Sequence, residues 1–156
     1  MNKLPMLLDC DTGVDDAVAI LLSKHLQTLE LVAVTTVAGN VEVEHTTRNT
    51  LQVLELADMR DIPVYIGAAK PLLGEPVTAH HVHGMNGLNE IVLPQPARKA
   101  EEMPAWDAIY AYAKKYKGEL VIVAIGPLTN LALAIAKYKE LPKLIRRIVI
   151  MGGAAV

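Results

Sequence analysis

Cysteine, clusters of positive charge and long apolar runs are all scarce or missing in this chain of 156 residues. The single cysteine, Cys10, excludes an internal disulfide. The 15 Lys and Arg residues form no cluster and the formal net charge is −2, so we expect no nucleic acid partner. No apolar run reaches the roughly 20 residues that a membrane-spanning helix needs, and the short apolar stretch after Lys3 does not resemble a secretory signal. These absences favour a cytoplasmic protein with no membrane partner.

The composition and the apolar pattern predict a folded α/β protein. With 52% hydrophobic and 21% charged residues, we expect one domain over residues 1–156 with a real core. Apolar runs that predict strands alternate with helical patterns, and residues 68–103 read as a long loop. The predicted strands are 4–8, 29–37, 64–66, 120–125 and 145–150, and the predicted helices are 15–26, 43–56, 104–116 and 127–137. This order predicts an open, mostly parallel sheet with helices on both faces.

Four carboxylates follow the first predicted strand within eight residues: Asp9, Asp11, Asp15 and Asp16. Like charges about 4 Å apart repel by roughly 1 to 4 kcal/mol, so such a cluster needs a cation, a shared proton or a helix N-terminus to offset the repulsion. Oxygen-only ligands suit a hard cation such as Ca²⁺ or Mg²⁺ rather than zinc. Asp11 is the strongest candidate, because acids are depleted in buried strands.

Structural interpretations compete with the functional ones at these acids. Asp15 fits a capping box with Thr12, and Asp16 fits a solvated acid in the first helical turn. Thr129 and Asn130, which follow Pro127 at a predicted helix start, fit helix caps.

Polar residues also follow the other strands, where a parallel sheet binds its ligands. Asn40 follows the second strand and fits either a site or a turn, and Met151 follows the fifth strand and fits either a ligand contact or the core. The long loop adds His80, His81 and His83, which lack the spacing of a zinc site. We expect a single histidine to face the substrate.

Five motifs, in chain order, resemble segments of the inosine-uridine-preferring nucleoside hydrolase family. The first is DCDTGVDDA at residues 9–17, which matches the pattern D-x-D-x-G-x-D-D-A. The others are AGN at 38–40, HG-x-x-GL at 83–88, GPLTN at 126–130 and IVIMGG at 148–153. The resemblance covers the whole chain and implies a Rossmann-like fold of the nucleoside hydrolase type. It also implies hydrolysis of the N-glycosidic bond of ribonucleosides to free base and ribose.

The resemblance implies one Ca²⁺ as the cofactor. The ligands implied in this chain are the carboxylates of Asp11 and Asp16 and the backbone carbonyl of Ile125. The ion would hold the attacking water, and Asp11 would take a proton from that water. The positive charge that develops on the sugar ring would be stabilised by the surrounding carboxylates.

The resemblance also implies the contacts to a small-molecule ribonucleoside. Asp15 would bond a ribose hydroxyl, and Asn40 would orient the water or the sugar. His83 would lie near the base, and Met151 would lie beside the ribose.

Family members are about twice this length, and many form dimers or tetramers. The resemblance therefore implies that the chain is the N-terminal part of a longer, homo-oligomeric protein. The other half would supply a further Asp ligand, ribose contacts and the acid that protonates the leaving base, so we expect the 156-residue chain alone to be inactive. Met85-Asn86 also replaces the Glu-Ser that is more usual after His-Gly.

Two alternatives remain at the level of sequence. A haloacid-dehalogenase-type Mg²⁺ phosphatase also begins with D-x-D after a first strand, but it has Thr or Val where this chain has Gly13. The other alternative is a remnant of an enzyme without catalysis, which binds an ion weakly or serves as a structural subunit.

Overall fold

Strands and helices alternate along the chain of the computed structural model, which describes residues 3–153. Residues 1–2 and 154–156, which the predicted domain over 1–156 includes, lie outside the described residues. The strands are β1 (Leu4–Cys10), β2 (Leu29–Thr36), β3 (Val64–Ile66), β4 (Leu120–Ala124) and β5 (Ile145–Ile150). The helices are α1 (Val14–Ser23), α2 (Val43–Leu56), α3 (His80–His83), α4 (Ala105–Lys115), α5 (Thr129–Lys137) and α6 (Leu141–Leu144).

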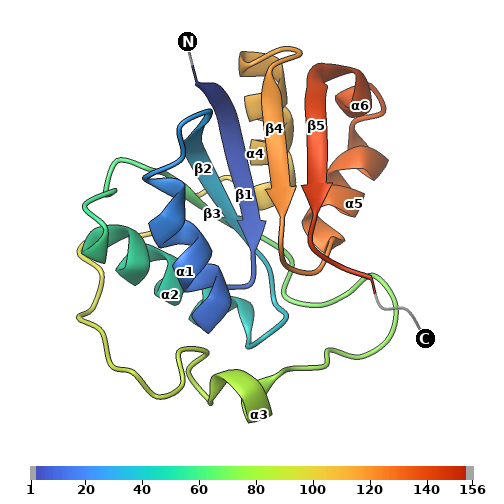
Figure 1. The fold of residues 1–156 in the computed structure, drawn as a ribbon. Helices are drawn as coiled ribbons and strands as arrows, with labels where there is room; N and C mark the ends of the chain where they lie inside the picture. The colour runs from blue at the N-terminus through green and yellow to red at the C-terminus, as the bar shows by residue number, and fades with distance from the viewer. Residues whose placement is uncertain (1–2, 154–156) are drawn as a thin grey trace.

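All five strands pair in parallel, in the order β3-β2-β1-β4-β5 (Figure 1). The predicted open, parallel α/β sheet is confirmed. The strand order reverses between β1 and β4, because the chain builds outward from β1 in one direction and later in the other. In open α/β sheets, ligands bind beyond the carboxyl ends of the strands at such a reversal. The turns after β1 and β4 are therefore the expected place for a site.

Side chains alternate between two cores, one on each face of the sheet. Met6 and Leu8 of β1 pack on the face covered by α1 and α2, where Ile20 and Leu54 are buried. Leu7 points to the opposite face and packs with residues of α4, α5 and α6. Figure 1 shows this arrangement, with α1 and α2 on one side of the sheet and the last three helices on the other. The prediction of helices on both faces is thus confirmed.

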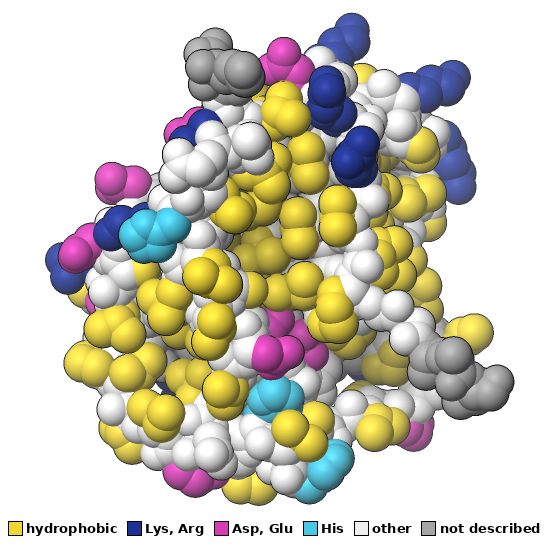
Figure 2. All heavy atoms as spheres, viewed as in Figure 1, with side chains coloured by type: hydrophobic (Ala, Val, Ile, Leu, Met, Phe, Trp, Pro, Cys, Tyr) yellow, Lys and Arg dark blue, Asp and Glu magenta, His cyan; other side chains and the backbone are white. Residues whose placement is uncertain are grey.

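The face of β4 and β5 on the α1 side is only partly covered. Val123 pairs in register with Val149, which is 45% exposed, and Leu22 of α1 is 60% exposed. A groove of about 280 Å³ between α1 and the sheet is lined by apolar residues that include Leu22, Val123 and Ile125. Figure 2 shows apolar side chains gathered over this face. We call Val18, Leu22, Val123, Val149 and the groove the apolar face.

The predicted element bounds match the structure for α2, β3 and β5, and differ by a few residues elsewhere. The helix predicted over 15–26 ends at Ser23, whose hydroxyl donates to the carbonyl of Ile20 at 2.6 Å. Such a bond from a serine to its own preceding turn competes with the helical pattern. Helices α3 and α6 are not among the predicted elements, because four residues are too few to show a period.

Candidate functional site

Three of the four clustered carboxylates are buried, and Asp9, at the end of β1, is fully so. Asp11 is 6% and Asp16 is 2% exposed. Asp16 Oδ2 accepts the backbone N–H of Gly13 at 3.0 Å, so Asp16 caps the start of α1 from within the helix. The interpretation of Asp16 as a solvated acid is therefore wrong. The Thr12–Asp15 capping box is also wrong, because the buried Thr12 hydroxyl lies 2.6 Å from the hydroxyl of Thr50.

Asn40, at the end of the loop after β2, bridges the two buried carboxylates. Its backbone N–H donates to Asp11 Oδ2 at 2.8 Å, and its side-chain Nδ2 donates to the Asp11 carbonyl at 3.1 Å. The same Nδ2 lies 3.2 Å from Asp16 Oδ2. These contacts bring the first and second predicted motifs together. The interpretation of Asn40 as a plain turn residue does not account for these contacts.

Two glycines allow the neighbouring loops to close around Asp11. A Cβ atom on Gly39 would lie 2.2 Å from Asp11 Oδ2, and one on Gly126 would lie 2.7 Å from Asp11 Oδ1. Gly126 follows β4, so the Ile125–Gly126 peptide lies beside Asp11. The N–H of Ile125 donates to the carbonyl of Asp9 at 2.8 Å, which continues the β1–β4 register into the site. Three loops thus meet at one carboxylate because glycine leaves room for it.

Burial makes the ionised state of these carboxylates costly. It raises the pKa of Asp16 from 3.8 to about 7, with the charge of Asp11 as the next cause. Burial also raises the pKa of Asp11, while the Asn40 N–H opposes the rise. Asp16 Oδ1 is buried without a hydrogen-bond partner. The pKa of the Cys10 thiol is raised well above its usual value by burial and by Asp16, which agrees with an inert, buried cysteine.

The donor set suits a hard cation. The side chains offer carboxylate oxygens that repel each other, and one of these oxygens has no partner. Ca²⁺ takes roughly six to eight oxygen ligands, including carbonyls and water. Within residues 3–153, no group of three or more His, Cys, Asp or Glu side chains is placed to hold a metal. The described residues therefore fit part of a coordination shell, to which Asp11, Asp16 and the Ile125 carbonyl would contribute.

His83 lies over the N-terminus of α1, next to Asp15. Its Nδ1 accepts the N–H of Val14 at 3.3 Å and lies 4.0 Å from Asp15 Oδ1. The Asp15 side chain is 69% exposed, so it borders the buried pair and faces solvent. His80 instead lies 3.6 Å from Glu42 at the start of α2. The short helix α3 is thereby held against both α1 and α2, and His83 is its residue nearest to the acid cluster.

Met151 lies at the carboxyl end of β5. Its backbone N–H donates to the carbonyl of Ala124 at 2.9 Å, which places it next to Ile125. The residue is 57% exposed, so the interpretation of Met151 as a core residue is wrong.

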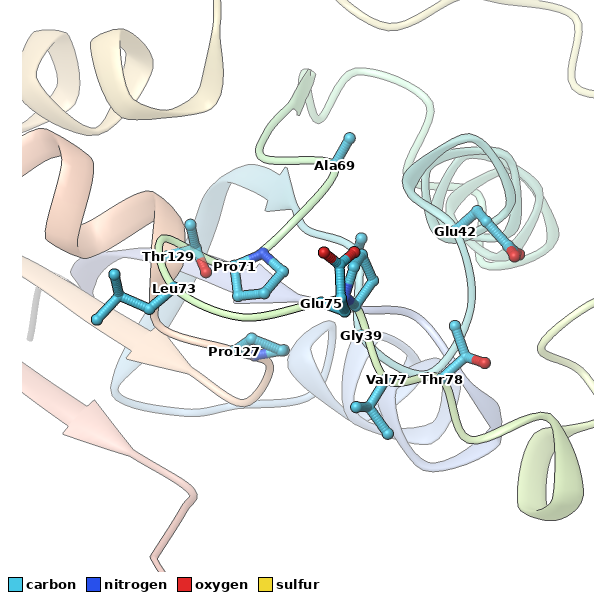
Figure 3. A pocket seen from close by; sticks show the side chains of 12 residues that line it. Gly39, Glu42, Ala69, Pro71, Leu73, Glu75, Val77, Thr78, Pro127 and Thr129 are labelled. Atoms are coloured by element: carbon cyan, nitrogen blue, oxygen red, sulfur yellow. The ribbon is translucent and has the colours of Figure 1, made fainter.

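A cavity of about 480 Å³ lies beside the acid cluster (Figure 3). Gly39, Pro127 and Thr129 line it from the loops after β2 and β4. Residues of the segment 68–78, among them Pro71 and Val77, form the rest of its lining, with Pro71 near Thr129. Because Gly39 touches Asp11, this cavity is directly next to the carboxylate pair.

Sequence reasoning missed Asn130. Its position two residues into α5 predicted a cap, but its side chain is fully buried and bonds to β1, β2 and the segment 68–78 instead. The sequence signal was an amide among apolar residues. That signal does not distinguish a helix cap from a buried amide that bonds to distant segments.

The fold and the site define an α/β protein with a buried carboxylate pair at the reversal point of a parallel sheet. The family model for the inosine-uridine preferring nucleoside hydrolases matches residues 6–156, and the chain belongs to this family. The recognition made from the sequence motifs is thus confirmed. Family membership does not favour the phosphatase alternative.

Relatives and solved structures agree with this membership. The chain is 43% identical over 150 residues to uridine nucleosidase 1 of Arabidopsis thaliana, and the alignment covers 96% of this chain and 45% of that protein. It is 44% identical over 151 residues to the pyrimidine-specific ribonucleoside hydrolase RihA of Escherichia coli, and the alignment covers 97% of this chain and 49% of RihA. A plant nucleoside hydrolase structure superposes with a TM-score of 0.93 at 37% identity, and the match covers 98% of this chain and 49% of the plant chain.

The chain spans about half the length of the curated relatives it matches. Among the helices of the described residues, none has the length and apolarity needed to cross a membrane.

Proposed function

We propose that this protein hydrolyses the N-glycosidic bond of ribonucleosides, with the Asp11–Asp16 pair at the centre of its active site. The observation that supports this most is the buried carboxylate pair, bridged by Asn40 at the carboxyl ends of β1 and β2. Buried charge of this kind opposes folding unless a partner, a proton or a cation offsets it, so its presence supports a functional role. Membership in a family whose characterised relatives are named for ribonucleoside hydrolysis supports the same conclusion.

We propose Ca²⁺ as the cofactor, held by the carboxylates of Asp11 and Asp16 and the carbonyl of Ile125. When bound, the ion supplies an anchor for ribose hydroxyls and lowers the pKa of the attacking water. The unpartnered Asp16 Oδ1 and the raised pKa of Asp16 support a cation at this place, because a positive charge would offset both. The donors that complete the shell would come from water, from the substrate or from residues beyond those described.

The chain's own residues would divide the chemistry among them. Asp11 would accept the proton of the attacking water, since the Asn40 N–H bond keeps one of its oxygens fixed. Asp15, exposed at the rim, would bond a ribose hydroxyl. As the C1′–N bond breaks, positive charge develops on the ribose ring, and the carboxylates would stabilise it.

The remaining substrate contacts would come from Asn40, His83 and Met151. The Asn40 amide would orient the water or the sugar while it bridges the carboxylates. His83 is held beside Asp15, which supports a place near the base. Met151, exposed after β5, would lie beside the ribose. We further propose a cytoplasmic location and a homo-oligomeric assembly for the protein.

Ribose release by a hybrid enzyme tests this function. Residues 1–156 would replace the matching half of Escherichia coli RihA, to which they are 44% identical. We expect the hybrid to release ribose from uridine or inosine. The Asp11→Asn hybrid should release it at least about 100-fold more slowly, which is the usual minimum effect of losing a general base. A folded hybrid that releases no ribose, or that releases phosphate from an aryl phosphate instead, would contradict the proposal.

A further inference from the structure

The side chain of Asn130 joins three segments that are far apart in the sequence. Its Nδ2 donates to Asp9 Oδ1 and to the carbonyl of Thr36, both at 2.8 Å. Its Oδ1 accepts the N–H of Ala68 at 2.9 Å. The carboxyl ends of β1 and β2 and the start of the segment 68–78 therefore meet at one buried amide.

Gly67 makes this meeting point possible. A Cβ atom on Gly67 would lie 2.2 Å from both Asn130 Oδ1 and the Thr36 carbonyl. A second hydrogen bond holds the start of this segment against the loop after β2: the N–H of Ala38 donates to the carbonyl of Ala68 at 2.9 Å. The segment 68–78 thus leaves the sheet in a direction that the Asn130 amide and its neighbours determine, and it then forms one wall of the 480 Å³ cavity.

The other side of the Asn130 amide reaches the strand that carries Asp11. Asp9 is fully buried, and its Oδ1 accepts the Thr35 hydroxyl at 2.6 Å in addition to Asn130. The backbone carbonyl of Asp9 accepts the N–H of Ile125. Asp9 therefore holds β1, β2 and β4 together two residues before Asp11.

We propose that Asn130 is a positioning residue, which couples the segment 68–78 to the end of β1 and so sets the cavity wall relative to Asp11. Helix capping does not account for its contacts, since none of the three goes to an N–H of α5. The coupling needs a donor and an acceptor on one planar group, and an amide supplies both. Only its bearing on catalysis rests on the proposed function, because the coupling itself is a property of the fold.

Amide hydrogen exchange on the 156-residue chain tests the coupling without any activity. Asn130→Asp keeps the size and the acceptor, but its ionised form donates neither bond and repels the Asp9 carboxylate. We expect peptides over 67–78 to exchange roughly tenfold faster in this variant, while peptides over α4 change far less. The matched control is Gln27→Glu, an exposed amide-to-carboxylate change that should alter neither region. Unchanged exchange over 67–78, or equal acceleration over 67–78 and α4, would overturn the proposal.

A reciprocal exchange of partners gives a second, independent test. Asp9→Asn combined with Asn130→Asp restores one amide–carboxylate bond between the two positions. We expect this double variant to regain part of the protection over 67–78 that Asn130→Asp loses. A double variant that exchanges as fast there as Asn130→Asp would overturn the coupling through Asp9. If Asn130→Asp does not fold, Asn130→Ser, which keeps one donor, is measured in its place against the same control.

Discussion

At the scale of single residues, burial and charge oppose each other at Asp16. The carboxyl caps α1 through Gly13, but its second oxygen is buried without a partner. A cation would relieve this conflict, and so would a proton. In the cation-free protein only a proton can relieve it, so the stability of that form depends on pH.

Asp16→Asn should make the cation-free protein more stable at neutral pH. The pKa of Asp16 rises from 3.8 to about 7 on folding. Protonated Asp16 therefore contributes fully to the free energy of unfolding below about pH 4, and this contribution is lost as the pH rises through 7. Each pKa unit is worth about 1.4 kcal/mol, and we expect the variant to gain on the order of 2 to 4 kcal/mol at pH 7.5. Urea unfolding in chelator between pH 4 and 8 measures this. A variant that is less stable at pH 7.5 would contradict the assignment.

His83→Ala should alter base recognition and leave the cation site intact. His83 contacts Val14 and Asp15, and neither contact involves Asp11 or Asp16. In the RihA hybrid we expect a higher KM or a changed ratio of uridine to inosine turnover. Calorimetry of the same variant should show unchanged Ca²⁺ binding. Loss of the ion in His83→Ala would place His83 in the metal site instead.

At the scale of elements, the site depends on loops that approach one strand end at close range. Gly39 and Gly126 belong to the loops after β2 and β4, and both touch the Asp11 carboxylate. A side chain at either position would push Asp11 away from Asn40. The geometry of the site therefore depends on the absence of side chains as well as on the charged residues.

Gly39→Ala tests this dependence. The new Cβ would lie 2.2 Å from Asp11 Oδ2 and 2.8 Å from Pro127, and overpacking of this kind costs roughly 1 to 3 kcal/mol. We expect a lower free energy of unfolding and weaker Ca²⁺ binding. Gly152→Ala is the matched control, because its Cβ would meet only Ile150 at 3.6 Å. Equal effects of the two substitutions would argue against close packing around Asp11.

The elements were predictable to the extent that their patterns are periodic. Helix α2 and strands β3 and β5 have the predicted bounds, and the gathering of Asp11, Asp16 and Asn40 followed from the rule that parallel strands end at one edge. Asn130 was assigned to the wrong role, because its partners Asp9, Thr36 and Ala68 are 62 to 121 positions away. A sequence pattern reports local spacing and does not report such distant contacts.

At the scale of the whole molecule, the apolar face is the most unusual feature of the surface. Val18, Leu22 and Val149 are each between 45% and 60% exposed, and Leu22 also lines the apolar groove. β5 is also the edge of the sheet, with backbone groups that can pair with another strand. Exposed apolar area and an open edge together favour association.

The 156-residue chain should therefore self-associate in a concentration-dependent way. Light scattering after size exclusion should give masses above the 16.9 kDa of one chain. Leu22→Glu combined with Val149→Glu should shift the protein to the monomer, because the new charges would have to be buried. Val92→Glu, which changes a 90% exposed residue outside this face, should have no effect. A wild-type chain that stays monomeric at high concentration would contradict this expectation.

We propose that the buried carboxylates of Asp11 and Asp16 form a cation site. Calorimetric titration of the chain with Ca²⁺ at pH 7.5 tests it most directly, with Glu102→Gln as the control for an exposed acid. We expect one Ca²⁺ per chain in the wild type and the control, with proton release because the pKa of Asp16 is about 7. We expect no binding when Asp11→Asn and Asp16→Asn are combined. Equal Ca²⁺ uptake by that double variant, or none by the wild type at millimolar Ca²⁺, would contradict the claim.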